Sequence, residues 1–195
     1  MGTEGNARLT AITGVVLVAL LAVEGVTILS VRPMLSVHVF VGLMLIPPVA
    51  LKLGSTGWRF LRYYTGNFAY RRKGPPPTLL RLLGPVVVLT TVGVLGSGVA
   101  LLLAGPSSRD ALMPVHKASF ILWLAATSIH VLWHMWSVPR LVRDDLPGAR
   151  PVAAAPPGRA LRWLAVGTAL ACGVALGAAL LPHAGPWHDF HHFDH

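Results

Sequence analysis

The sequence predicts an all-α fold, an integral membrane helical bundle of about five transmembrane helices. Of the 195 residues, 54% are hydrophobic and only 12% are charged, and the mean hydropathy is +0.64. A soluble domain cannot hide this much apolar surface, whereas a lipid bilayer can. The formal net charge of +9 is concentrated between the apolar stretches, where membrane topology explains it, so we expect no nucleic-acid partner.

Five apolar stretches are each long enough to cross the hydrocarbon core, which takes ~20 residues of helix. They are Ala11–Val31, Met34–Leu53, Leu82–Leu103, Val115–Val138 and Ala160–Leu181. No small-residue cleavage site follows the first stretch, so we expect a retained helix rather than a signal peptide. Pro47 and Pro48 interrupt the hydrogen-bond ladder of the second stretch, which predicts a kink there.

The loops between these stretches differ strongly in charge. The short first and third loops carry only Arg32 and Arg109 as charged basic residues. The long segment between the second and third stretches has no acidic residue and contains Lys52, Arg59, Arg62, Arg71, Arg72, Lys73 and Arg81. The positive-inside rule therefore places this segment and the N-terminus in the cytoplasm and the C-terminus outside. A cytoplasmic aromatic belt of Trp58, Trp133, Trp136 and Trp163 agrees with that orientation.

Two histidines lie at matching depths in the predicted bundle. His38 is near the start of the second stretch and His116 near the start of the fourth, and both stretches run from outside to inside. Two histidines from facing helices at one level can bind a haem iron from both sides. Gly42 lies four residues after His38, on the same helix face, and leaves room for a flat macrocycle. The pattern predicts a haem bound by His38 and His116 near the outer face.

Two further histidines lie deeper in the fourth stretch. His130 follows His116 by 14 residues and His134 follows it by 18, so all three share one helix face. Such spacing, ~21 Å along the axis for the first interval, is what two stacked haems need. The alternatives are hydrogen-bonded or interfacial structural histidines, or an i, i+4 pair that binds a transition metal.

The histidine motifs resemble those of the bacterial cytochrome b561 family and of the haem b membrane subunits that serve periplasmic oxidoreductases. The resemblance covers residues 11–138 and is carried by three segments, Ser36–Gly42, Val115–Ser119 and Ile129–His130. It implies a bacterial plasma membrane protein in which His38 and His116 bind an outer haem b and His130 an inner one. The family's partner for the later histidine comes from the first helix, which has no histidine here. One haem b is therefore expected, and a second is left open.

The expected domain organisation combines this resemblance, for the first four helices, with the apolar stretches and loop composition of the rest of the chain. Residues 1–138 form a four-helix cytochrome b-like core, 139–159 a cytoplasmic loop, 160–181 a fifth transmembrane helix and 182–195 a histidine-rich extracytoplasmic tail. Histidine-rich tracts can bind copper, zinc or nickel, although a disordered polar end is the alternative. The candidate metal ligands outside the haem pair are His134, His188, His191, His192 and His195.

Three charged residues lie near the expected outer site. Glu24 is in the first stretch, where it either relays protons beside the haem or pairs with Arg32 or Lys117, the pairing being slightly favoured. Arg32 and Lys117 are placed where haem propionates would emerge, and simple snorkelling to the interface explains them equally well.

The leading functional hypothesis is an electron-transfer subunit rather than a stand-alone enzyme. Its haem would exchange electrons between a quinone and an extracytoplasmic redox protein, with membrane lipid around it, and the segment Trp58–Tyr70 is a candidate quinone region. The alternatives are a haem-dependent metal or superoxide reductase, and a membrane metal-handling or transport protein. The single Cys172 excludes an internal disulfide and a cysteine-ligated cluster, and no phosphate loop or dinucleotide fingerprint is present.

Overall fold

The protein is a bundle of long helices, and its computed structural model describes residues 2–72, 74, 77–136, 138–143, 145 and 157–190. Five helices are long and apolar enough to cross a membrane. They are α1 (Thr3–Leu29), α2 (Leu35–Tyr64), α4 (Thr78–Ala104), α5 (Arg109–His134) and α7 (Arg159–Leu180). No strand occurs in the described part of the chain, so the predicted all-α multi-pass membrane bundle is confirmed.

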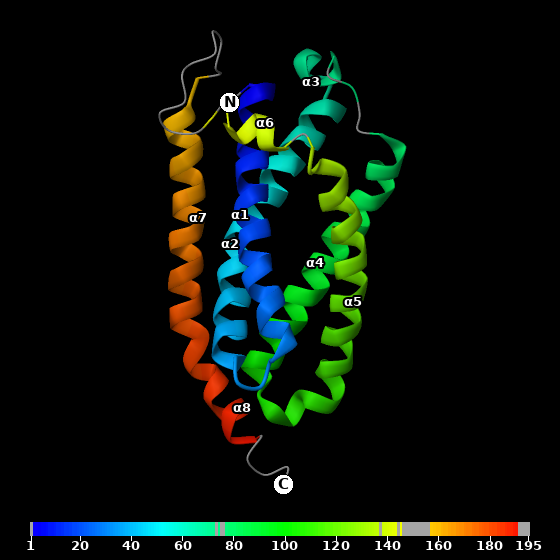
Figure 1. Ribbon diagram of the computed structural model, residues 1–195. Coiled ribbons are helices and arrows are strands. Elements are labelled where there is room, and N and C mark those ends of the chain that lie inside the picture. Colours follow the sequence, from blue (N-terminus) through cyan, green and yellow to red (C-terminus); the bar gives the residue numbers. More distant parts are fainter. Residues whose placement is uncertain are drawn as a thin grey trace.

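Short helices lie at the two ends of the bundle. They are α3 (Phe68–Arg72), η1 (Pro106–Ser108), α6 (Val138–Arg143), η2 (Leu181–Ala184) and α8 (Gly185–Phe190). In Figure 1, α3, α6 and the N-terminus lie at one end, called here the N-terminal end. The turn between α1 and α2 lies at the other end together with α8, and this is called the C-terminal end.

The helices are longer than the apolar stretches that predicted them. Helix α1 begins at Thr3 rather than Ala11, and α2 continues past Leu53 to Tyr64, so the helix carries the amphipathic basic segment beyond the apolar core. Helix α2 is continuous through Pro47 and Pro48. Each proline removes one backbone donor, and packing against α1 on one side and α7 on the other supports the helix here.

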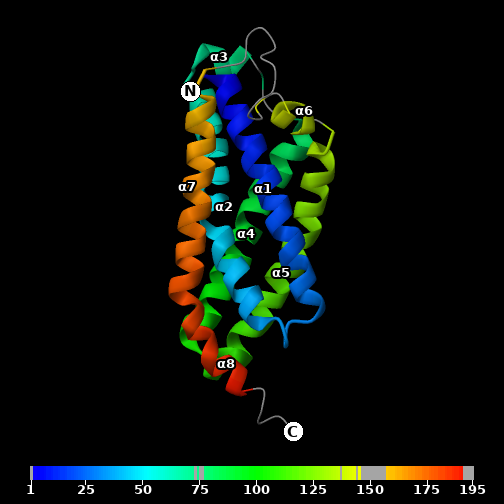
Figure 2. The ribbon, with the colours of Figure 1, turned by 60° about the vertical axis from the view of Figure 1, so that its left-hand side comes forward.

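The four helices α1, α2, α4 and α5 form two pairs. Helix α1 packs along α2, α4 packs along α5, and the two pairs meet mainly through α2 and α4. Figure 1 shows the pairs on either side of the bundle axis, and Figures 1 and 2 show α2 and α5 running in the same direction. A residue early in α2 therefore lies at the same level as a residue early in α5.

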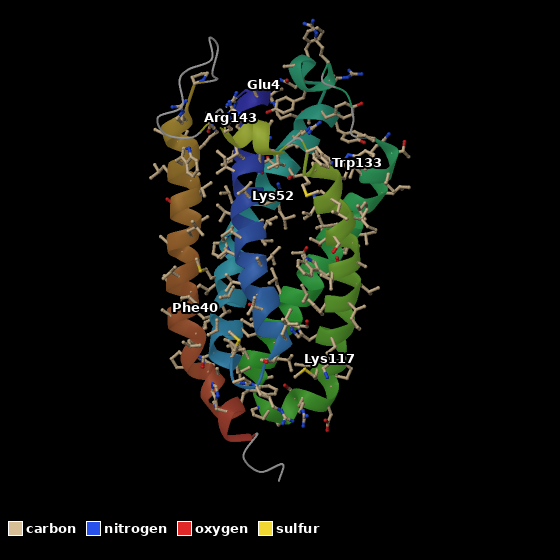
Figure 3. All side chains as sticks on the ribbon, in the orientation of Figure 1. Glu4, Phe40, Lys52, Lys117, Trp133 and Arg143 are labelled. Atoms are coloured by element: carbon tan, nitrogen blue, oxygen red, sulfur yellow. The ribbon has the colours of Figure 1, made fainter. Side chains whose placement is uncertain are left out.

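Helix α7 packs on the outer side of α2, away from the α4–α5 pair. Gly173 lies against the main-chain carbonyl of Met44, and Gly177 lies against the ring of Phe40, so any side chain at either glycine would collide. Small residues permit this close helix approach. Figure 3 shows Phe40 on the side of α2 that faces α7. Helix α7 thus packs against α2 from outside and is not part of the four-helix core.

A buried ion pair ties the start of α7 to the chain that follows α6. The side chains of Arg162 and Asp145 are both fully buried, and Nε of Arg162 donates to Oδ2 of Asp145 at 2.8 Å. Nη1 of Arg8, from α1, lies 3.7 Å from the same carboxylate. Because Asp145 neutralises Arg162, this arginine adds little to the net positive charge at the start of α7.

Candidate functional site

A large apolar cavity separates the α1–α2 pair from the α4–α5 pair. Its volume is about 2600 Å³, compared with ~300–1000 Å³ for an ordinary small-molecule pocket. All four helices contribute lining residues, among which leucine and valine are the most frequent, whereas α7 contributes none among the residues described. The basic and imidazole side chains along its walls include His38, Lys52, His116, His130 and His134.

His38 and His116 face each other across the C-terminal half of this cavity. Their ring centroids are 6.5 Å apart and their planes are nearly perpendicular, at 83°. An imidazole nitrogen lies ~2 Å from a bound metal and ~1 Å from its own ring centre, so two rings on opposite sides of one ion have centroids ~6 Å apart. The observed separation therefore fits one metal ion held between the two rings, with the rest of a flat ligand in the apolar cavity.

Protein groups occupy Nδ1 of both rings. Oε1 of Glu24 lies 2.8 Å from Nδ1 of His38, and the hydroxyl of Thr27 lies 3.0 Å from the same nitrogen. The hydroxyl of Ser97, from α4, lies 3.0 Å from Nδ1 of His116. Such outer contacts fix the tautomer and orientation of a ligating histidine. Among the described residues, the side-chain partners of both rings contact Nδ1, so Nε2 is the nitrogen that we expect to face a ligand.

The favoured pairing of Glu24 with Arg32 or Lys117 is wrong. Glu24 pairs instead with His38, and its side chain is only 13% exposed. Arg32 and Lys117 are both exposed at the C-terminal end, where they line the mouth of the cavity. The carboxylate of Glu24 lies directly beside the imidazole of His38, whereas both cations are exposed at the end of the bundle, and this is why Glu24 pairs with the histidine.

Two glycines bring helix backbones close to the paired histidines. A Cβ at Gly98 would lie 3.2 Å from Cε1 of His116, so α4 approaches this ring more closely than a larger residue would allow. Gly42 lines the cavity, as expected, and a Cβ there would lie 3.6 Å from Oε1 of Glu24. Sequence reasoning missed Gly98, Thr27 and Ser97, because a glycine or hydroxyl residue in an apolar helix signals a site only when its facing helix is known.

His130 and His134 lie toward the N-terminal end of the cavity, on α5. Their ring centroids are 4.6 Å apart, and Nδ1 of His134 bonds to the carbonyl oxygen of His130 at 2.9 Å. Nδ1 of His130 is buried, and no hydrogen-bond partner for it is present among the described residues. Nor does any group of three or more histidine, cysteine, aspartate or glutamate residues in that part of the chain form a site for a metal ion.

The C-terminal tail begins as folded structure. Residues Leu181–Ala184 and Gly185–Phe190 are helical, and Trp187 is buried and lines the cavity. Nε2 of the exposed His188 lies 3.0 Å from the hydroxyl of Ser36, two residues before His38. The disordered alternative is therefore wrong for this part of the tail, while His191, His192 and His195 lie outside the described residues.

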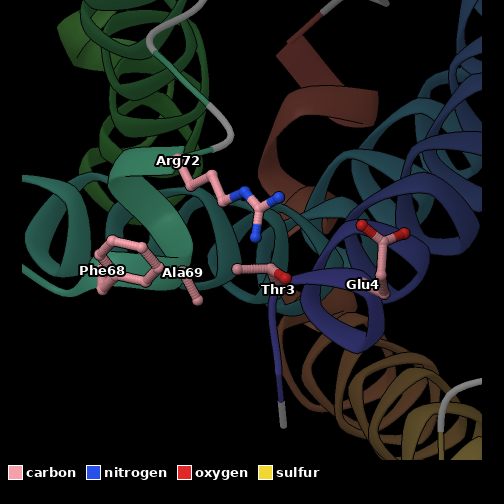
Figure 4. A pocket seen from close by; sticks show the side chains of 5 residues that line it. All are labelled: Thr3, Glu4, Phe68, Ala69 and Arg72. Atoms are coloured by element: carbon pink, nitrogen blue, oxygen red, sulfur yellow. The ribbon is translucent and has the colours of Figure 1, made fainter.

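The N-terminal end of the bundle has two openings. The main cavity is lined there by aromatic residues of the expected quinone region, Phe60, Tyr63, Tyr64 and Tyr70. A separate surface pocket of about 360 Å³ lies between the start of α1 and α3, and Figure 4 shows Arg72 extending over Thr3 in it. This pocket contains none of the histidines.

The apolar cavity thus contains two groups of polar residues. His38 and His116, with their Nδ1 atoms fixed, lie in its C-terminal half, and His130, His134 and Lys52 lie in its N-terminal half. Figure 3 places Lys52 near the N-terminal end and Lys117 at the C-terminal end. No family model, curated protein or solved structure matches the chain. The function of the protein must therefore be inferred from the geometry of this cavity.

Proposed function

We propose that the protein is a membrane b-type cytochrome whose haem iron is bound by His38 and His116. The observation that carries this proposal is the 6.5 Å separation of the two ring centroids across an apolar cavity. Bound in this way, a haem supplies a one-electron carrier whose potential the protein adjusts through ligands, burial and hydrogen bonds. The expected role is electron transfer rather than bond chemistry.

The chain's own residues prepare both imidazoles for this role. Glu24 and Thr27 hold Nδ1 of His38, and Ser97 holds Nδ1 of His116, which directs the lone pair of each Nε2 to the ligand. The apolar walls contributed by α1, α2, α4 and α5 exclude water from the site. Gly42 and Gly98 carry no side chain that would fill the space beside Glu24 and the ring of His116.

The charge pattern supports an orientation in a bacterial plasma membrane. The basic segment from the end of α2 to the start of α4 favours an orientation with the N-terminal end in the cytoplasm. His38 and His116 then lie near the outer face. Arg32, Arg109 and Lys117 line this end of the cavity, where cations would pair with haem propionates.

The proposed electron partners are a quinone in the bilayer and an extracytoplasmic redox protein. Phe60, Tyr63 and Tyr64 line the cavity at the membrane interface of the N-terminal end, where an aromatic surface suits a flat quinone head group. The C-terminal end, with its exposed cations, suits an acidic protein surface.

One observation favours a second candidate function, a haem-dependent metal or superoxide reductase. His188 of the tail contacts Ser36, so the histidine-rich tail begins beside the proposed haem. A metal ion held by the tail would then lie close to an electron source. Reduction of a soluble metal complex by the haem, abolished when the tail is removed, would favour this candidate over a protein partner.

The proposed function is tested by the visible spectrum and haem content of protein purified in detergent. We expect a low-spin b-type α-band after reduction by dithionite. His38→Ala and His116→Ala should each remove the haem that this pair binds. His183→Ala is the matched control, because His183 is exposed and its Nδ1 bonds to the nearby main-chain carbonyl of Leu180, three residues earlier. A well-folded wild-type protein without haem would exclude the proposal.

A further inference from the structure

Lys52 is a basic residue on the wall of the cavity, inside the membrane-spanning helix α2. Its Nζ donates a hydrogen bond to the carbonyl oxygen of Thr10 on α1, at 2.6 Å. Within the described residues, no carboxylate forms an ion pair with it. An ammonium group is costly in an apolar bundle, so a lysine there usually has a functional partner.

The position of Lys52 repeats that of His38 one level deeper. Lys52 follows His38 by 14 residues on α2, and His130 follows His116 by 14 residues on α5. In an α-helix this interval advances ~21 Å and returns to within about 40° of the same face. Because α2 and α5 run in the same direction, residues 14 positions after His38 and His116 should lie at one common level, ~21 Å from the first pair.

The structure places the two members of this second pair in one region of the cavity. Lys52 and His130 both line the cavity, and both lie toward its N-terminal end, where Figure 3 labels Lys52 and where α5 ends at His134. Nδ1 of His130 is buried within the protein, which leaves Nε2 as the nitrogen that a ligand in the cavity can reach. The cavity volume of about 2600 Å³ has room for more than one ligand of the usual size.

The side chain of Lys52 crosses from α2 to α1. A Cβ at Gly14 would lie only 2.9 Å from Nζ, so the absence of a side chain at Gly14 makes room for the amine. Helix α1 contains no histidine, and the amine of Lys52 is the nitrogen presented on this wall. The bond to Thr10 uses one N–H and orients the group, while a neutral amine keeps its lone pair for a metal.

We propose that Lys52 and His130 are the axial ligands of a second haem, at the N-terminal end of the cavity. This inference rests on the proposed function, since it assumes that the cavity binds haem at its other end. On binding, the ammonium of Lys52 would release one proton to water at the N-terminal opening of the cavity, and the lone pair of the neutral amine would bind the iron. Of the two hydrogens that remain, one keeps the bond to Thr10. The neutral amine removes the uncompensated charge from the membrane.

The test is haem content per chain by the pyridine haemochrome assay, together with low-temperature electron paramagnetic resonance. Full-length wild type is compared with Lys52→Leu, Lys52→Arg and Lys52→His. Arginine keeps the positive charge but offers no lone pair, so it separates a ligand from a simple cation. We expect two haems in wild type, one in the leucine and arginine variants, and two in the histidine variant, with a new bis-imidazole signal.

The outer haem serves as the internal control for folding. Retention of its signal in the leucine and arginine variants shows that the bundle is intact, because His38 and His116 come from the same two helices. One haem in wild type, or two in Lys52→Arg, would overturn the inference while leaving the proposed function in place. No haem in any variant would overturn both.

Discussion

The carboxylate of Glu24 lies 2.8 Å from Nδ1 of His38, whereas the ring of His116 has uncharged partners, the hydroxyl of Ser97 at 3.0 Å from its Nδ1 and the main chain of Val94. The two rings are therefore held by unequal partners. A carboxylate withdraws the Nδ1 proton more strongly than a hydroxyl and makes the imidazole a stronger donor to a metal. A negative charge beside the site also stabilises the oxidised, more positive iron.

Replacing this carboxylate should raise the potential of the outer haem. In Glu24→Gln the side chain keeps its size and can still accept a hydrogen bond, but the charge is gone. We expect the midpoint potential to rise by roughly 60 mV, which is a tenfold change in a one-electron equilibrium. Spectroelectrochemical titration measures it, with Glu4→Gln as the control because Glu4 lies at the N-terminal end. An unchanged potential would show that Glu24 has only a structural role.

Removing the hydroxyl of Ser97 should make the ring of His116 less firmly oriented and so increase the rate of haem loss. In Ser97→Ala, Nδ1 of a half-buried imidazole loses its hydroxyl partner, and an unsatisfied buried nitrogen costs ~1–3 kcal/mol. We expect faster haem loss at elevated temperature, measured from the decay of the Soret band with apomyoglobin as acceptor. Thr90→Ala is the control, because that hydroxyl bonds only within its own helix. Equal rates of haem loss in both variants would contradict the assigned role of Ser97.

The depth of the paired histidines could be predicted from the sequence because a membrane-spanning helix has a constant rise per residue. Once the apolar stretches give the direction of each helix, residue number gives the level of His38 and His116. The structure brings both rings to one level, as that argument predicts. The same argument gives the level of His130 and Lys52.

The partners of these side chains could not be predicted in the same way. Whether Glu24 meets His38 or Arg32 depends on how α1 is rotated against α2, and the uniformly apolar α1 carries no strong face pattern that fixes this rotation. Ser97 is one hydroxyl among several in α4, and only its register with α5 identifies it. Tertiary packing thus decides the hydrogen bonds, while helix periodicity decides the levels.

Weakening the packing of α7 should lower the stability of the protein without changing the amount of haem that it binds. A methyl group at Gly173 would collide with the Met44 carbonyl, so Gly173→Ala should destabilise the α2–α7 contact by ~1–3 kcal/mol. Haem per chain should not change, because no described residue of α7 lines the cavity. Thermal unfolding in detergent measures the first effect and the haemochrome assay the second. Gly167→Ala, where no atom lies within 4 Å, is the control.

Breaking the buried ion pair should be the most destabilising single change at the N-terminal end. In Arg162→Ala the carboxylate of Asp145 stays fully buried, and its remaining cationic neighbour among the described residues is the more distant Arg8, at 3.7 Å. A buried charge left without its partner costs ~3–5 kcal/mol. The double variant Arg162→Met, Asp145→Leu removes both charges and should recover most of that loss, since an apolar pair needs no compensation. Melting temperatures of the two variants in the same detergent check this. If the double variant is as unstable as Arg162→Ala, the ion pair contributes through its hydrogen bonds to neighbouring backbone, such as the one to the carbonyl of Pro157, rather than through its charge.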